Sequence, residues 1–210
     1  MNESSSLKRN WLRLALWLVG GTLVYNTIEA GVAIYAGVNA RSIALIGFGL
    51  DSIIEFAAAL MLLWRLAVEA RGADRERVET TERQVRRFVG LTFFALAAYV
   101  IGQAGFNLWV SQAPEESLLG IVLAAVSLVV MPLVSWGKLR AARAIGSAAL
   151  RAEAKETLAC SYLSFTLLLG LGLHAWIGWW WADPLAALLM APWLIKEGFE
   201  GFEVEEEDDD

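Results

Sequence analysis

Six long apolar stretches, separated by shorter polar ones, divide the chain along nearly its whole length. They cover residues 12–36, 43–66, 88–110, 118–136, 152–173 and 175–195. A helix rises about 1.5 Å per residue, so each stretch can cross a hydrocarbon core roughly 30 Å thick. None of them alternates polar and apolar residues as a barrel strand would. Because unpaired backbone polar groups are not tolerated in lipid, the pattern predicts an all-α membrane protein with six transmembrane helices.

Basic residues are concentrated in alternate connections between the stretches. These residues are Lys8, Arg9 and Arg13, then Arg71, Arg75, Arg77, Arg83, Arg86 and Arg87, then Lys138, Arg140, Arg143 and Arg151. The other three connections hold little basic charge. Cytoplasmic loops of membrane proteins are enriched in Lys and Arg, so we predict that both termini are cytoplasmic. The charged connection at 70–87 is helix-compatible, and we expect a solvated helical extension there.

This pattern divides the chain into three parts. We expect a cytoplasmic N-terminal segment at residues 1–10, a six-helix transmembrane domain at 11–197 and an acidic cytoplasmic tail at 198–210. The first apolar stretch is longer than the core of a signal peptide, so we expect no cleaved signal. We place the protein in a bilayer as a multi-pass protein, in a bacterial inner or cell membrane.

The composition supports this interpretation and narrows the function. Hydrophobic residues make up 57% of the chain, mean hydropathy is +0.51, and ten Trp suit the interfacial belts of membrane proteins. The single Cys excludes an internal disulfide framework. The formal net charge of −6 comes mostly from the tail, and no basic face for nucleic acid remains without it. No HExxH or nucleophile–base motif is present, so we do not expect an enzyme.

The second stretch contains two acids four residues apart, Asp51 and Glu55. That spacing places both carboxylates on one helix face, one turn apart. A charged side chain at the middle of a bilayer costs about 2.5–3.5 kcal/mol on insertion scales. We therefore expect compensation by water, by polar side chains within the bundle or by a bound cation. We predict a cation, because acids within membrane helices mark ion pathways.

The segment around these acids has a counterpart three helices later. Residues 42–55 read SIALIGFGLDSIIE, and residues 147–160 read SAALRAEAKETLAC. Aligned without gaps, Asp51 matches Glu156 and Glu55 matches Cys160. Helices three spans apart cross in opposite directions, as in transporters built from inverted repeats, whose substrates bind near the midplane. The match indicates either a 3+3 inverted repeat or a chance similarity between two Ala/Leu-rich segments.

Glu156 and Cys160 are also four residues apart and share a helix face. Counted from the expected helix ends, Glu55 and Cys160 lie at the same depth, with Asp51 and Glu156 about one turn to either side. Three carboxylates and a thiol suit a tetrahedral cation such as zinc. The thiolate favours thiophilic ions over magnesium or calcium. Ligands lose protons when they bind metal, which predicts exchange of metal for protons.

Each candidate residue also has a plainer interpretation. Glu156 could be an interfacial residue paired with Lys155, and Cys160 could be a small core residue. Glu29 is a further acid within the first stretch, with Asn26 one turn before it. We treat both as auxiliary metal ligands, although Glu29 could equally be a proton relay or a structural hydrogen-bond partner. His174 is expected near the outer interface.

Around these residues the sequence resembles the cation diffusion facilitator family of divalent-metal transporters. The resemblance rests on S-x-A-L-x5-D-x3-E ending at Asp51 and Glu55, on the AEAKETLAC segment with Glu156 and Cys160, and on WWWADPLAALLMA with Asp183 and Pro184. Asn26 and residues 31–37 are similar to the family's first helix. The resemblance implies six helices with cytoplasmic ends, a metal site between the second and fifth helices, and a homodimer.

The chain also departs from the family pattern. Glu156 and Cys160 stand at positions where the family usually has histidine and aspartate, and Glu55 stands where it usually has aspartate. Phe48 replaces an aspartate three residues before the first ligand. No histidine-rich loop is present, and we expect a short member without the C-terminal cytoplasmic domain that usually follows the sixth helix.

These observations predict a transporter whose substrate is a divalent metal cation. We expect proton-coupled efflux of zinc or a similar thiophilic ion of the zinc, cadmium and iron class. The proposed ligands are Asp51, Glu55, Glu156 and Cys160. The alternative is a membrane protein that binds metal on a transporter scaffold without turnover.

Overall fold

The computed structural model describes residues 3–70, 75–111, 115–146, 148–200 and 202. Within these ranges the chain forms six α-helices and no β-strand. The helices are α1 (Glu3–Ala40), α2 (Ile43–Ala70), α3 (Arg75–Val110), α4 (Leu118–Ile145), α5 (Ala148–Ile177) and α6 (Ala182–Glu200). The all-α fold predicted from the apolar stretches is therefore confirmed.

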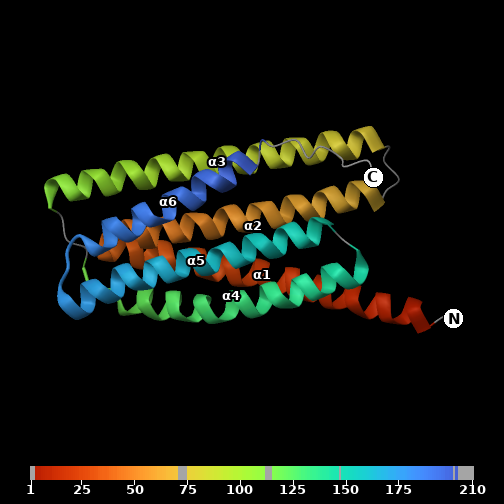
Figure 1. The fold of residues 1–210 in the computed structure, drawn as a ribbon, viewed down its shortest axis with the longest axis horizontal. Coiled ribbons are helices and arrows are strands. Elements are labelled where there is room, and N and C mark those ends of the chain that lie inside the picture. Colours follow the sequence, from red (N-terminus) through yellow and green to blue (C-terminus); the bar gives the residue numbers. More distant parts are fainter. Residues whose placement is uncertain (1–2, 71–74, 112–114, 147, 201, 203–210) are drawn as a thin grey trace.

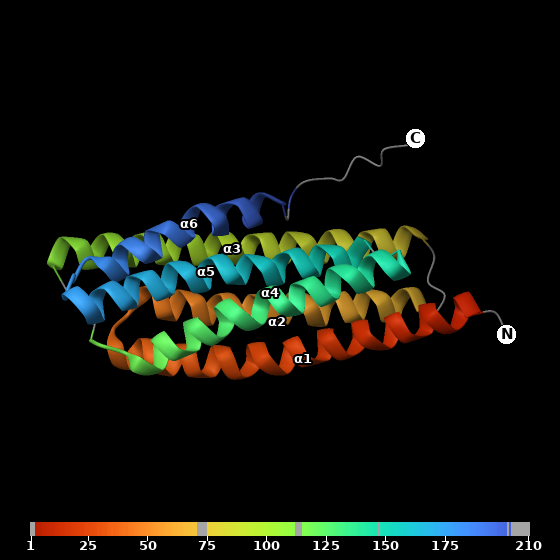
Figure 2. The same ribbon diagram turned by 60° about the horizontal axis from the view of Figure 1, so that its bottom comes forward.

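The helices run up and down along a common direction, and each connection reverses the chain (Figure 1). α2 packs against α1, α3, α5 and α6, and α5 packs against α2, α4 and α6. α1 and α4 are neighbours on one side of this central pair, and α3 and α6 are neighbours on the other (Figures 1 and 2). Side chains that α2 and α5 turn toward each other consequently lie in the middle of the bundle.

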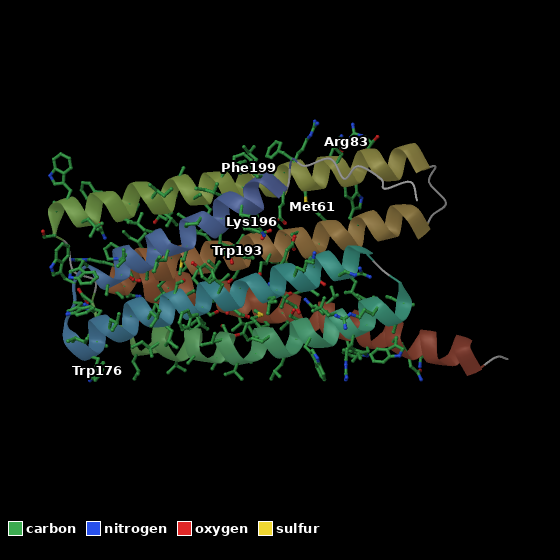
Figure 3. The ribbon with its side chains drawn as sticks, in the orientation of Figure 1. Met61, Arg83, Trp176, Trp193, Lys196 and Phe199 are labelled. Carbon is green, nitrogen blue, oxygen red and sulfur yellow. The ribbon has the colours of Figure 1, made fainter. Side chains whose placement is uncertain are left out.

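Among the described residues, four helices contain stretches that are long and apolar enough to cross a bilayer. These stretches are Ile43–Met61, Gly90–Val110, Leu118–Ile145 and Glu153–Ile177. Large apolar side chains also face outward, and Trp17, Trp109 and Trp176 are 80%, 91% and 85% exposed. Figure 3 shows Trp176 near the last residues of α5, at one end of the bundle. An apolar outer surface of this kind suits contact with lipid, so the architecture is that of a multi-pass membrane protein.

Most helices continue beyond the apolar stretches that predicted them. α3 begins at Arg75, so the described part of the charged connection at 70–87 is helical, as expected. Residues 3–10, expected as a separate segment, are continuous with α1. α6 runs to Glu200, and apart from residue 202 the rest of the predicted acidic tail lies outside the described residues.

The predicted boundary between the fifth and sixth stretches is wrong by several residues. α5 continues through His174 to Ile177, and α6 begins only at Ala182. Gly178 ends α5 with φ 72° and donates its N–H to the His174 carbonyl, a left-handed conformation that glycine adopts at low cost. Hydropathy misses this break because three consecutive Trp at 179–181 keep the sequence apolar across it.

Several helix pairs approach each other closely through glycine, and two of them, α1–α2 and α5–α6, each include one of the central helices α2 and α5. A Cβ atom on Gly49 of α2 would lie 3.0 Å from the Cβ of Ala33 and 2.8 Å from the Ile34 side chain, both on α1. A Cβ atom on Gly170 of α5 would lie 2.5 Å from the Cβ of Ala186 on α6. Small residues allow such approach in membrane bundles, where packing rather than water exclusion holds helices together. The α1–α2 pair and the α5–α6 pair are therefore tightly packed.

The first turn of α2 is anchored by the first turn of α6. Ser42 is the residue before α2; its hydroxyl donates to Oδ1 of Asp183 and accepts from the N–H of Leu45 at 3.1 Å. Oδ2 of Asp183 accepts the N–H of Ile43 at 3.0 Å. Both side chains are fully buried. Free N–H groups at a helix start need such acceptors, so this contact fixes the position of α2, which carries the acid pair.

Asp183→Ala is expected to lower the stability of the bundle by about 1–3 kcal/mol, because it leaves buried donors of α2 without an acceptor. The measurement is the melting temperature of the detergent-purified chain. Asp183→Asn keeps one carbonyl oxygen and should lose less. An unchanged melting temperature for Asp183→Ala would show that this anchor contributes nothing.

Candidate metal site

Asp51 and Glu55 lie one turn apart on the face of α2 that is turned into the bundle. Asp51 is 3% exposed and Glu55 is 8% exposed. In the described part of the chain, no Lys, Arg or His forms a salt bridge with either carboxylate. The sequence analysis expected these acids to need compensation, and within the described residues no basic side chain provides it through a salt bridge.

Cys160 of α5 faces these acids across the centre of the bundle and is fully buried. One ligand atom from each of Asp51, Glu55 and Cys160 can be chosen so that all three lie within 4.8 Å of one another. Two donors bound to the same tetrahedral zinc ion lie about 3.3–3.5 Å apart, given bonds of roughly 2.0–2.3 Å. Side-chain shifts of about an ångström would therefore let all three contact one ion. We call these three residues the donor group.

Glu156, the fourth predicted ligand, does not belong to the donor group. It lies on the same helix face as Cys160, one turn closer to the start of α5, and it is partly exposed. Its carboxylate interacts electrostatically with Glu197 of α6, with Glu153 and with Lys138. The four-residue spacing that places Glu156 below Cys160 also displaces it by about 6 Å along the helix axis.

Asn26 and Glu29 bring α1 to the donor group, and each is 1% exposed. The amide nitrogen of Asn26 donates to Oε2 of Glu55 at 3.0 Å. Oε2 of Glu29 accepts from the Ser52 hydroxyl at 2.9 Å and lies 4.0 Å from the sulfur of Cys160. The two auxiliary residues predicted from the sequence thus touch two members of the donor group directly.

A row of hydroxyl groups supports Glu29 from three other positions. Ser127 of α4 donates to Oε1 of Glu29, and the Tyr25 hydroxyl lies 2.7 Å from the Ser127 oxygen. Because the single Ser127 proton is used on Glu29, Tyr25 is the donor in this second bond. Tyr25, Ser52 and Ser127 are not among the residues predicted from the sequence. Their only signal is that they are polar residues within apolar helices, and Ser52 directly follows Asp51.

The sequence analysis assigned Lys138 to a basic loop because of its charge. In the structure it is fully buried within α4. Its ammonium group lies 2.8 Å from Oε1 of Glu153 and 2.9 Å from the Thr157 hydroxyl, both on α5. Oε2 of Glu153 is buried without a hydrogen-bond partner. The loop assignment was wrong because α4 continues nine residues beyond the apolar stretch, to Ile145, and Lys138 lies on its inner face.

His174 lies near the end of α5, away from the donor group. Its Nδ1 lies 3.3 Å from the Trp179 carbonyl. This contact fits the expected ring at the end of the bundle and does not involve the candidate metal ligands.

A family model described as the cation efflux transmembrane domain matches residues 22–203. An uncharacterized transporter of Synechocystis sp. is 28% identical over 177 residues, which is 83% of this chain and 56% of that protein. The cation-efflux pump FieF of Shewanella oneidensis is 29% identical over 117 residues, which is 52% of this chain and 39% of the pump. The chain thus spans about half the length of the relatives it matches.

Proposed function

The chain belongs to the cation efflux family, also called the cation diffusion facilitator family, and we propose that it carries divalent metal cations across a membrane. The resemblance inferred from the sequence is thereby confirmed, and the family points to transport rather than enzymatic catalysis. The observation that carries the proposal is the donor group: Asp51, Glu55 and Cys160 converge from the two central helices without a basic partner in the described residues. Buried negative groups of this kind need a positive ion.

All six helices span the membrane in this proposal, with both ends of the chain in the cytoplasm. The alternating basic connections support that orientation. The up-and-down topology also places the start of α1 at the end of the bundle where α2 meets α3 and α4 meets α5, and α6 runs toward the same end (Figure 1). Glu156 would then be a carboxylate that an ion meets between the cytoplasm and the donor group. A homodimer and the 3+3 inverted repeat belong to the same proposal.

Zinc, or another thiophilic ion such as cadmium, is the proposed substrate. The donor group combines one sulfur with carboxylate oxygens, a set that zinc accepts and that magnesium and calcium do not favour. Efflux from the cytoplasm in exchange for protons is the proposed direction and coupling. Binding the metal displaces protons from the thiol and the carboxyl groups, which gives a physical basis for exchange.

Transport is tested by reconstituting the purified chain in liposomes that contain a zinc-sensitive dye. Zinc and cadmium should enter at a rate that saturates with concentration, whereas magnesium and calcium should enter no faster than in protein-free liposomes. Metal binding in detergent without any flux would overturn transport. It would favour the alternative of a metal-binding membrane protein on a transporter scaffold.

Cys160→Asp is expected to change the choice of ion rather than to abolish transport. It exchanges the sulfur donor for oxygen, so cadmium should lose more than zinc, and the cadmium-to-zinc flux ratio should fall by about tenfold or more. The measurement is the two fluxes on the same liposomes. An unchanged ratio would remove the thiol from the selectivity of the site.

A further inference from the structure

The donor group supplies three ligands, and a tetrahedral ion takes four. The fourth predicted ligand, Glu156, lies one turn away along α5. In the described part of the chain the other carboxylate in contact with the donor group is that of Glu29 on α1. The choice is therefore between a water molecule, a large displacement of Glu156 and a small displacement of Glu29.

The geometry around Glu29 favours the last of these. Its Oε2 lies 4.0 Å from the sulfur of Cys160, whereas a sulfur and an oxygen on one tetrahedral zinc ion lie about 3.5 Å apart. Glu29 also lies near enough to Asp51, Glu55 and Cys160 for its charge to act on all three. A movement of about half an ångström would bring its Oε2 to the distance from the Cys160 sulfur that two ligands of one zinc ion have.

The Glu29 carboxylate is also oriented by hydrogen bonds, as metal ligands in proteins usually are. Ser52 and Ser127 donate one hydrogen bond to each of its oxygens, from α2 and α4. Its carboxylate is 1% exposed, and within the described ranges no basic side chain forms a salt bridge with it. Hydrogen bonds that orient metal ligands are typical of built metal sites, where they fix the direction of the donor atom.

An unsatisfied oxygen beside the donor group points independently to a cation. Asn26 is 1% exposed, its amide nitrogen donates to Glu55, and its Oδ1 has no hydrogen-bond partner. A buried carbonyl oxygen without a donor costs about 1–3 kcal/mol. The positive charge of a cation bound by the neighbouring Glu55 would offset part of this cost without a direct bond to the Asn26 oxygen.

Charge does not oppose four acidic ligands. Three carboxylates and a thiolate around a divalent ion have a formal charge of about −2, the same as the four-thiolate zinc sites of many proteins. Hydrogen-bond donors point their positive ends at these carboxylates. The hydroxyls of Ser52 and Ser127 donate to Glu29, and the amide of Asn26 donates to Glu55. Hydrogen bonds to charged groups are the strong ones, so these donors offset part of the charge.

We infer that Glu29 is the fourth ligand, so that α1, α2 and α5 together hold the ion and the fifth-helix acid Glu156 does not. This assignment rests on the proposed function, because it concerns the same ion and the same donor group. It adds a third helix to the site and names the class of ion: a four-coordinate divalent cation such as zinc, cobalt or cadmium.

Cobalt is the probe for this assignment, because four-coordinate Co²⁺ absorbs visible light far more strongly than five- or six-coordinate Co²⁺. The detergent-purified full chain should give the strong absorption together with a thiolate-to-cobalt charge-transfer band. Glu29→Gln should weaken cobalt binding by about 100-fold and, at saturating cobalt, reduce the visible absorption, because water molecules that enter in place of the carboxylate raise the coordination number above four. Glu116→Gln, the same change at an exposed site, is the control.

Gln at this position keeps one acceptor oxygen for either Ser52 or Ser127, and its amide nitrogen can donate to the hydroxyl oxygen of the other, so the metal-free variant should melt at nearly the wild-type temperature. Cobalt should raise the wild-type melting temperature and leave that of Glu29→Gln almost unchanged. Glu29→Asp keeps the charge but shortens the side chain by one methylene, so this variant should bind cobalt with intermediate affinity. A metal-free Glu29→Gln that is destabilised but still gains the full wild-type rise with cobalt would make Glu29 a structural residue and overturn the assignment.

Two further variants separate this assignment from the proposed function. If Asp51→Asn loses cobalt while Glu29→Gln keeps wild-type affinity and absorption, the site stands and the assignment of Glu29 fails. The assignment also fails if Glu156→Gln, rather than Glu29→Gln, weakens binding and reduces the absorption. If Asp51→Asn binds cobalt like the wild type, the donor group itself is wrong and the proposed function loses its support.

Discussion

Asp51→Asn is expected to reduce zinc flux into liposomes by about 100-fold or more. The change removes one of the three negative donors of the donor group, and a neutral ligand in its place binds a cation much less strongly. The amide has nearly the same shape, so the variant should fold and insert normally. Zinc flux and zinc binding should fall together, because the same contact is lost in both.

Glu116→Gln is the matched control for Asp51→Asn. It makes the same loss of one negative charge at an exposed position between α3 and α4, and flux should stay within about twofold of wild type. Wild-type flux in Asp51→Asn would contradict the proposed site, since one of its ligands could then be lost without consequence.

Lys138→Met is expected to destabilise the bundle by about 3–5 kcal/mol, the largest stability effect among these predictions. The Lys138 ammonium and the Glu153 carboxylate are both buried, and their 2.8 Å contact joins α4 to α5. Removing the cation leaves a carboxylate without its partner inside the bundle. For a chain of this size the melting temperature should fall by roughly 10 °C.

The double variant Lys138→Met/Glu153→Leu gives the opposite sign and so identifies the cause. Replacing a buried ion pair by apolar residues of similar size is often neutral or stabilising, because the desolvation cost of both charges disappears. The melting temperature should therefore return to the wild-type value or rise above it. A double variant as unstable as Lys138→Met alone would mean that the lysine acts through packing and not through its charge.

The fold and the three residues of the donor group could be predicted from the sequence because they follow from short-range rules. Hydropathy gives the helices, and a four-residue spacing gives the shared faces of α2 and α5. Asp51, Glu55 and Cys160 could be paired because topology places the second and fifth helices side by side in the family that the sequence resembles. The geometric part of that prediction agrees with the structure for these three residues.

Glu156, Lys138 and Glu29 show what spacing alone cannot decide. A helix face does not fix how far two helices are shifted along each other, and a shift of one turn separates Glu156 from the donor group. The charge of Lys138 suggests a loop residue, because the sequence does not show that Glu153 will neutralise this charge. The two side chains meet only when α4 and α5 pack together. The contacts of Glu29 with α2, α4 and α5 likewise depend on tertiary packing.

Two of the glycine contacts join helices that carry the proposed ligands: three ligands lie on the α1–α2 pair and one lies on the α5–α6 pair. Gly49 fixes α2 closely to α1, and Gly170 fixes α5 closely to α6. If each pair moves as a unit, Asp51, Glu55 and Glu29 stay together, and only the sulfur of Cys160 separates from them. Separation of the two pairs would then break the metal–thiolate bond first and leave the ion on three carboxylates. Ions that exchange sulfur ligands slowly would turn over slowly even where they bind most tightly.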